Sequence, residues 1–253
     1  MKLVVLALSL FVGVSPAFAQ SPDLDRETRL KNQIVDAIFD GDPIELEAEG
    51  HPFLAIDMEA GEGNKGAAII LHGRGFHPDW ASVIQPLRIG LTDWGWRTLS
   101  IQMPVLGKEA KYFDYVPIFP DAQPRITAAI DYLKEQGVSR IVLIAHSCGA
   151  HMAMHRFNTR GDDEFAAFVG IGMGATDYKQ PMMEGYPMPQ MSIPVLDIFG
   201  SEDYPAVLRM APERKAGLKN VKSGQVVIQG AGHYFEDKAT PLVEAIGQWL
   251  DNI

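Results

Sequence analysis

Six short apolar runs, separated by segments of helical length, constrain the fold of this chain more than any other feature. Continuous runs of this length are typical of strands that are buried on both faces of a parallel sheet. Because right-handed crossovers place the intervening helices on both faces, the pattern predicts an α/β fold with a mostly parallel central sheet. The runs are residues 67–71, 98–102, 140–145, 166–171, 195–199 and 225–228, and the clearest helical patterns are 122–136, 149–157, 206–218 and 241–250.

The sequence ahead of these runs follows a different pattern. Apolar residues within 21–40 recur at spacings near 3.6, which predicts a short amphipathic helix at the edge of the domain. Residues 44–48 and 53–58 alternate as paired strands do, and the cluster 61–64 indicates the turn that ends them. We expect a hairpin at one edge of the sheet.

The first nineteen residues have the layout of a secretory signal peptide. Lys2 is followed by an apolar stretch to Val14, and Ala17-Phe18-Ala19 has the small residues of a cleavage site. The apolar stretch is shorter than the roughly 20 residues that span a bilayer, which argues against a membrane anchor. We expect cleavage of residues 1–19 after Ala19 and export to the periplasm or the exterior, with no integral membrane segment in the mature chain.

Length, charge and cysteine content exclude several classes of protein. Residues 20–253 have the length of one α/β domain. Lys2 is the only charged side chain in the removed segment, so the net charge becomes −11 instead of −10, which argues against a nucleic-acid partner. Cys148 is the only cysteine, so the chain cannot form an internal disulfide or a cysteine-based metal site.

The chemistry is expected just after the strands, because ligands bind at the carboxyl ends of parallel strands. Directly after the run 140–145 comes His146-Ser147-Cys148-Gly149, and then a helical segment. A tight strand-to-helix turn would expose the Ser147 hydroxyl to both a base and a substrate. We predict that Ser147 is a nucleophile.

This segment resembles the nucleophile elbow of the α/β-hydrolase superfamily. Within that superfamily, the chain is most similar to exported bacterial hydrolases of uncharacterised function. The departure is Ala145, which stands where the usual pattern has its first glycine. The resemblance covers most of residues 67–253, and it implies a serine, an acid and a histidine in that chain order. It also implies a single-domain hydrolase fold that needs no cofactor.

The other two members of the triad follow in this order. Asp203 lies in the loop after the run 195–199, where a carboxylate can orient the base, with Glu202 as runner-up. Asp197 lies inside the run and is expected to point away from the loop. His233 follows the last run in a glycine-rich loop and is predicted to be the general base.

An oxyanion hole is predicted from the loop after the first run. Leu71-His72-Gly73-Arg74-Gly75-Phe76 resembles the HG loop of the superfamily. We assign the two oxyanion donors to the backbone N–H groups of Arg74 and Cys148. The Arg74 side chain has two open interpretations, contact with a substrate carboxylate or a structural contact.

The remaining histidines are interpreted as structural. His151 and His155 share a helix face, but with no third ligand nearby in sequence we expect no metal site. His146 is expected to pack beside the nucleophile, and His77 and Trp80 to support the oxyanion loop. The thiol of Cys148 is expected to pack as a small side chain.

Two segments are candidates for the substrate side. Residues 172–194 hold five methionines, which fit either a short lid over an acyl pocket or a packed core loop. Residues 108–120 offer an aromatic wall.

The expected function is cleavage of a small-molecule carboxylic ester through an acyl-enzyme at Ser147. Peptidase, thioesterase or acyltransferase activity with the same triad is the alternative, and a non-catalytic binding protein on this fold is a second. The sequence does not indicate an oligomeric state.

Overall fold

The computed structural model describes residues 20–177 and 180–253. The predicted signal segment 1–19 lies outside the described residues. In chain order the elements are α1 (Leu24–Val35), β1 (Asp42–Ala48), β2 (His51–Met58), β3 (Ala67–Leu71), α2 (Ile84–Gly90), η1 (Leu91–Trp94), β4 (Arg97–Ile101), α3 (Tyr112–Tyr115), η2 (Val116–Ile118), α4 (Phe119–Glu135), β5 (Ile141–His146), α5 (Cys148–Arg160), β6 (Ala167–Ile171), η3 (Met188–Gln190), β7 (Val195–Gly200), α6 (Pro205–Gly217), β8 (Gly224–Ile228) and α7 (Ala239–Leu250).

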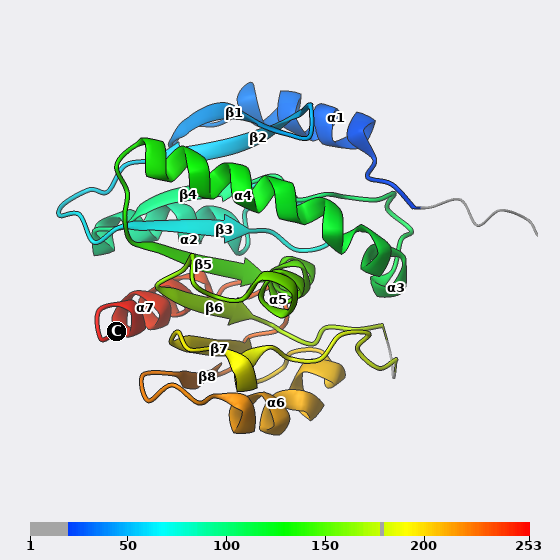
Figure 1. The fold of residues 1–253 in the computed structure, drawn as a ribbon, viewed down its shortest axis with the longest axis vertical. Coiled ribbons are helices and arrows are strands. Elements are labelled where there is room, and N and C mark those ends of the chain that lie inside the picture. The colour runs from blue at the N-terminus through cyan, green and yellow to red at the C-terminus, as the bar shows by residue number, and fades with distance from the viewer. Residues whose placement is uncertain (1–19, 178–179) are drawn as a thin grey trace, which may run out of the picture.

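A single eight-stranded sheet, in the order β1-β2-β4-β3-β5-β6-β7-β8, runs through the described part of the chain (Figure 1). β1 and β2 form the predicted hairpin at one edge, and β2 is also antiparallel to β4. The strands from β4 to β8 are parallel to one another. The mostly parallel α/β sheet is therefore confirmed.

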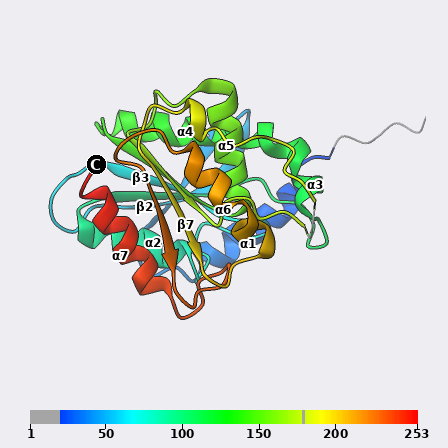
Figure 2. The same ribbon diagram turned by 90° about the horizontal axis from the view of Figure 1, so that it is seen from below.

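Two hydrophobic clusters cover the two faces of this sheet. Along β3, Ile69 packs into the cluster that includes α4 and α5, and Ile70 packs into the cluster that includes α2 and α7. Figure 2 shows α4, α5 and α6 on one side of the sheet and α2 and α7 on the other. Because both faces are covered, the central strands β3, β5 and β6 are apolar at nearly every position, which explains their continuous apolar runs.

The order of the strands places the candidate site. β3 pairs with β5 in a register that sets Leu71 beside Ala145, so the loops that follow these two strands begin side by side. β6 and β7 follow on the other side of β5, and because they are parallel to it their carboxyl ends lie on the same side of the molecule.

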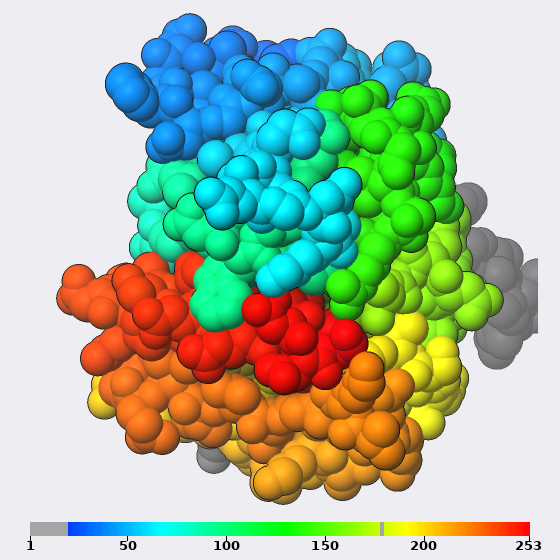
Figure 3. Space-filling model, turned by 90° about the vertical axis from the view of Figure 1, so that its left-hand side faces the viewer, coloured from blue at the N-terminus to red at the C-terminus, as the bar shows by residue number. Residues whose placement is uncertain are grey.

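The C-terminal end of the chain lies at the amino ends of the parallel strands. The space-filling view of that side shows the red C-terminal segment against the cyan segment that precedes β3 (Figure 3). The Lys65 ammonium and the Asp251 carboxylate form an ion pair there, with an Nζ to Oδ1 distance of 2.5 Å. The described helices include none long and apolar enough to cross a membrane.

Candidate active site

Ser147 lies between the end of β5 and the start of α5. Its backbone φ is 54°, which is uncommon for a residue with a side chain and costs about 1–3 kcal/mol. The Ser147 N–H donates to the Ile171 carbonyl at 2.8 Å, which holds the turn against the end of β6. Glycine is required two residues later, at 149, because a Cβ there would lie 2.4 Å from the His72 carbonyl oxygen. Strand and helix thus hold the hydroxyl in one strained turn.

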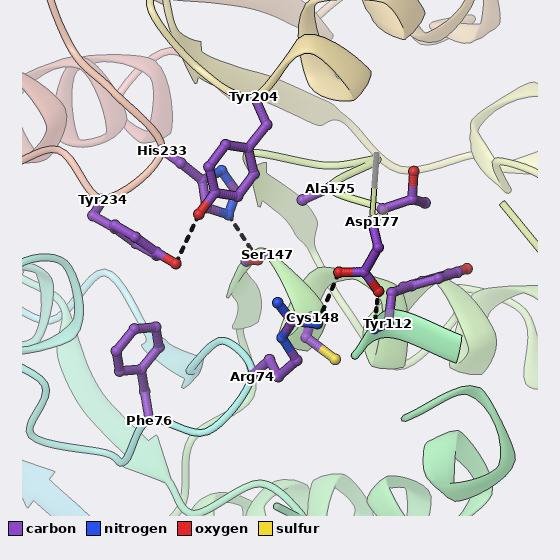
Figure 4. Close-up of a pocket in the computed structure, with 11 residues that line it drawn as sticks. Arg74, Phe76, Tyr112, Ser147, Cys148, Ala175, Asp177, Tyr204, His233 and Tyr234 are labelled. Atoms are coloured by element: carbon purple, nitrogen blue, oxygen red, sulfur yellow. Dashed lines mark hydrogen bonds and ion pairs between the residues drawn. The ribbon is translucent and has the colours of Figure 1, made fainter. Parts of the chain in front are cut away.

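The structure brings Ser147, His233 and Asp203 together, and Figure 4 shows the first two of these side chains. The Ser147 Oγ lies 2.8 Å from His233 Nε2, and His233 Nδ1 lies 2.6 Å from Asp203 Oδ1. A carboxylate can only accept, so Nδ1 carries the proton of the neutral ring and Nε2 is free to accept from the serine hydroxyl. The imidazole and the carboxylate are almost fully buried. This arrangement allows a proton to pass from serine to histidine.

The three candidate acids, one within β7 and two in the loop after it, differ in burial and in contacts. Glu202 is exposed, while Asp203 is 4% exposed and faces the histidine. The Tyr204 N–H donates to Asp203 Oδ1 at 2.7 Å, which fixes the carboxylate. Asp197 points away from the site and pairs with Arg214. Only Asp203 is therefore placed to orient His233.

Two glycines let neighbouring loops approach these side chains. Gly172, after β6, has a φ of 61°, and a Cβ on it would lie 2.8 Å from His233 Cε1. A Cβ on Gly73 would lie 3.0 Å from His146 Nδ1 and 3.2 Å from the Ser147 Cβ. The backbone of both loops can come this close because neither residue has a side chain.

The HG loop follows β3 and is fixed by a buried histidine. His72 Nε2 accepts from the Met103 N–H at 2.9 Å, and its Nδ1–H donates to the Gly73 carbonyl at 2.8 Å. Burial lowers the pKa of His72 to about 3, so the ring is neutral at pH 7. His72 therefore has a structural function beside the candidate oxyanion hole.

Arg74 and Cys148 line one pocket together with Ser147. Among residues 20–177 and 180–253, neither backbone N–H donates a hydrogen bond to another protein group. Two free N–H groups beside a serine nucleophile are the arrangement that an oxyanion requires. The Cys148 thiol is buried, and burial raises its pKa to about 12, so it remains protonated at neutral pH.

His146 supports the histidine loop, in line with its expected packing function. Its Nε2–H donates to the His233 carbonyl at 3.0 Å, and burial lowers the pKa of His146 to about 3. Trp80 packs against the His146 ring with centroids 5.4 Å apart and stacks on Phe76 at 3.7 Å. Trp80 thus connects the HG loop to the end of β5, next to Ser147.

Known proteins give one match by sequence family and many by fold. The matching family model describes a protein of unknown function, DUF3530, and covers residues 3–112, which end before Ser147. No curated protein matches the sequence.

Several solved structures that resemble the chain in fold carry the names of hydrolases or esterases. The alpha-beta serine hydrolase homologue from Coxiella burnetii has a TM-score of 0.60 at 18% identity, over 86% of this chain and 99% of that chain. Dienelactone hydrolase from Anabaena variabilis has a TM-score of 0.64 at 18% identity, over 84% and 97%. Esterase Pf2001 from Pyrococcus furiosus has a TM-score of 0.61 at 18% identity, over 87% and 95%.

The chain has the α/β-hydrolase fold. The resemblance stated for the segment around Ser147 is confirmed at the level of the superfamily fold. At this identity the solved structures establish the fold alone, so the activity is argued from the site.

Two tyrosines of the candidate site were not predicted from the sequence. The Tyr204 ring stacks on the His233 imidazole with centroids 4.2 Å apart, and its hydroxyl lies 2.8 Å from the Tyr234 hydroxyl (Figure 4). Burial and the Tyr234 hydroxyl raise the pKa of Tyr204, so its hydroxyl keeps its proton. The sequence did offer a signal for both tyrosines, since each directly follows a predicted triad residue.

The methionine-rich segment 172–194 contributes to the pocket, but through other side chains. Its Ala175, Thr176 and Asp177 line the pocket with Ser147, while none of the five methionines does. Met173, Met188 and Met191 are buried in the core, as the packed-loop interpretation expects, and Met183 is exposed. Movement of this segment as a lid stays a prediction.

The Arg74 side chain makes a contact within the protein. Its Nη1 lies 3.2 Å from Asp177 Oδ1, and the other Asp177 oxygen accepts from the Tyr112 N–H. Tyr112, from the predicted aromatic wall, also lines the pocket. The guanidinium is about one third exposed, so the contact with Asp177 leaves donors free for a ligand.

The His151 and His155 side chains do not converge on a metal site. His151 is buried against Tyr112, with ring centroids 4.8 Å apart, and His155 Nδ1 lies 2.6 Å from Glu184 Oε1. The described residues include no group of three potential ligands that could hold a metal ion.

Proposed function

We propose that this chain is a serine hydrolase that cleaves a small carboxylic ester. The observation that carries the proposal is the continuous chain of contacts from Ser147 Oγ through the His233 ring to the buried Asp203 carboxylate. A serine hydroxyl is a weak nucleophile, and it becomes reactive when a fixed base can accept its proton.

The proposed reaction begins with attack of Ser147 Oγ on the ester carbonyl while His233 Nε2 accepts the hydroxyl proton. The carbonyl oxygen becomes an oxyanion, which the N–H groups of Arg74 and Cys148 would bind. The intermediate then releases the alcohol, protonated by His233, and leaves an acyl group on Ser147. A water molecule, deprotonated by His233, then releases the acid. None of these steps needs a cofactor.

The backbone strain at Ser147 supports catalysis over a binding role. A non-catalytic protein on this fold has no need to keep a non-glycine residue at a φ of 54° and a hydroxyl within 2.8 Å of a buried histidine. An ester substrate is favoured because solved structures with this fold include a dienelactone hydrolase and an esterase. Peptidase, thioesterase and acyltransferase activities use the same groups and are the alternatives to be measured.

Export is the second part of the proposal. The support is the layout of residues 1–19, with its apolar stretch and the Ala17-Phe18-Ala19 site. The hydrolase would then work in the periplasm or outside the cell, on a substrate present there.

The test compares Ser147→Ala with Ser139→Ala, an exposed serine at the other end of β5. The purified proteins are assayed on p-nitrophenyl esters of graded acyl length, beside a peptide and a thioester, and treated with a fluorophosphonate probe. We expect the Ser147 variant to lose more than about a thousandfold of the ester hydrolysis. We also expect it to lose the label, while the Ser139 variant keeps both. Full esterase activity without Ser147 would refute the proposal, and a folded wild type that takes no label would favour a binding protein.

A further inference from the structure

A second pocket adjoins the one that contains Ser147, and its charged lining is entirely cationic. We call it the cationic pocket; it has a volume of about 240 Å³, and its charged lining residues are Arg26, Arg74, Lys108 and Lys111. No carboxylate belongs to its described lining. A chain with a net charge of −10 thus concentrates positive charge at one concave site.

One of the two arginines that line this pocket, Arg26, is held by carbonyl groups. The Arg26 guanidinium donates to the Gly75 carbonyl at 2.9 Å and to the Leu106 carbonyl. Carbonyl oxygens satisfy its donors without cancelling its charge. Arg26 therefore fixes the HG loop to the segment after β4 and leaves a positive charge between them.

The two lysines are exposed at the rim of the pocket. Neither Lys108 nor Lys111 forms an ion pair within the described residues. Glu109 and Asp114 are close in sequence, but neither lines the pocket, and the Asp114 carboxylate accepts from the Lys111 backbone N–H. The lysine ammonium groups are thus available to a ligand.

Arg74 and Tyr234 line both the cationic pocket and the pocket of Ser147. Figure 4 shows Tyr234 on one side of Ser147, Asp177 and Tyr112 on the other, and Arg74 below the serine with its guanidinium against Asp177. Asp177 is the single carboxylate in the described lining of either pocket, and it contacts only Arg74 among the four cations. A ligand bound at Ser147 could therefore extend past Arg74 into a positive environment.

We propose that the cationic pocket binds an anionic group of the substrate, a carboxylate or a phosphate, while the ester bond lies at Ser147. This inference rests on the proposed function and narrows it to esters that carry negative charge. Arginine and lysine donors form strong charge-assisted hydrogen bonds with both kinds of anion. The positive field would also raise the rate at which such substrates arrive.

The test removes the rim charges and leaves the catalytic groups untouched. The double variant Lys108→Ala/Lys111→Ala is compared with Lys219→Ala/Lys222→Ala, which removes the same charge from the loop before β8, at the opposite edge of the sheet. Two charged substrates place a carboxylate on either side of the ester bond: mono-p-nitrophenyl glutarate on the acyl side and 4-acetoxybenzoate on the alcohol side. Their neutral partners are p-nitrophenyl pentanoate and phenyl acetate. Inhibition by benzoate and by phenyl phosphate, measured with a neutral ester, tells a carboxylate site from a phosphate site.

We expect kcat/KM for one of the charged substrates to fall about fivefold in the Lys108/Lys111 variant, since each exposed charge contact contributes about 0.5 kcal/mol. The neutral substrates and the control variant should stay near wild type, and added salt should shrink the difference. Equal effects of both double variants, or equal losses on charged and neutral esters, would overturn the inference and leave the esterase proposal standing. A wild type that hydrolyses none of the four esters would overturn both.

Discussion

The contacts of single residues assign different functions to three neighbouring acids. Asp203 contacts His233, Glu202 is exposed on the same loop, and Asp197 is buried against Arg214. We expect Asp203→Asn to lower kcat about 10⁴-fold, because an amide in place of the carboxylate favours the wrong tautomer of His233. Glu202→Gln should stay within about twofold, because surface changes away from the site have small effects. Steady-state kinetics on one p-nitrophenyl ester measures both, and a larger loss in the Glu202 variant would reassign the acid.

Tyr204 is expected to act on the charge that develops on His233 during the reaction. Its ring lies 4.2 Å from the imidazole, with an angle of 21° between the planes, so the π face is available to the imidazolium. Tyr204→Leu should lower kcat about two- to fivefold, which corresponds to an exposed cation–π contact. Tyr204→Phe keeps the ring and should retain most of the activity. An equal loss in both variants would instead assign the effect to the hydroxyl and its contact with Tyr234.

His151 is expected to make the folded chain sensitive to acid. Burial lowers its pKa to about 3 from an ordinary value of 6.5, so the unfolded chain binds a proton that the folded chain does not. The stabilisation is therefore complete above pH 6.5 and is lost as the pH falls towards 3. Over the step from pH 7 to pH 5 this one group should lower the free energy of unfolding by about 2 kcal/mol.

Urea unfolding at the two pH values measures this effect. In His151→Leu the difference between the two pH values should shrink by about 2 kcal/mol, because the group that binds the proton is gone. His51→Gln is the control, since water already solvates that exposed ring in the folded chain. An unchanged difference in the His151 variant would show that the folded chain accommodates the charged ring.

Between elements, the buried ion pair of Asp197 and Arg214 joins β7 to α6. Arg214 Nε lies 2.8 Å from Asp197 Oδ2, both side chains are fully buried, and Gln225 Nε2 donates to the same carboxylate at 2.7 Å. Asp197→Asn should lower the free energy of unfolding by about 3–5 kcal/mol, because it leaves a buried guanidinium without a counter-charge.

The exposed ion pair of Lys31 and Glu45, which joins α1 to β1, is the matched control. Glu45→Gln should cost less than about 1 kcal/mol, because water screens the pair. Urea unfolding followed by tryptophan fluorescence measures both variants. The double variant Asp197→Leu/Arg214→Met should regain most of the lost free energy of unfolding, because it removes both buried charges. If it does not, the shape of the pair matters more than its charge.

The elements that the sequence predicted well are those whose pattern arises from burial on both faces. The run 67–71 is β3, and the other runs differ from their strands by one residue at each end at most. α2 was not predicted because it is seven residues long and Val83, at its N-cap position, makes no side-chain capping contact. α4 begins at Phe119, three residues before the predicted start, and the prolines at 120 and 124 obscure its first turn.

The sequence predicted those residues of the candidate site that directly follow a strand. It did not predict the contacts that form where separate loops meet in space. The order implied by the resemblance placed Ser147, Asp203 and His233 just after three predicted strands, which are β5, β7 and β8, and the structure brings them within hydrogen-bond distance. The pairing of Arg74 with Asp177 joins residues more than one hundred positions apart. A contact of that separation leaves no local pattern in the sequence.

At the scale of the whole molecule, α1 follows the predicted cleavage point closely in the sequence and contacts the HG loop of the candidate site. The Asp23 side chain accepts from the Arg26 N–H and caps the helix, which begins at Leu24. Glu27, in the first turn of α1, forms an ion pair with Arg125, with a distance of 2.8 Å between Oε2 and Nη1. Cleavage after Ala19 would leave this helix and its contacts with the site loops complete, because the described hydrogen bonds of α1 and its N-terminal cap begin at Pro22.

We therefore expect the exported protein to begin at Gln20 and to be as active as a chain expressed without residues 1–19. N-terminal sequencing of the exported product measures the first, and kcat/KM on one ester measures the second. Ala19→Arg should block processing, because the cleavage site requires small residues. A shorter chain that begins at Arg29 is the contrasting variant, since it lacks Arg26 and its hydrogen bond to the Gly75 carbonyl of the HG loop. If that truncation kept full activity while folded, the first turn of α1 would have no part in holding the oxyanion loop.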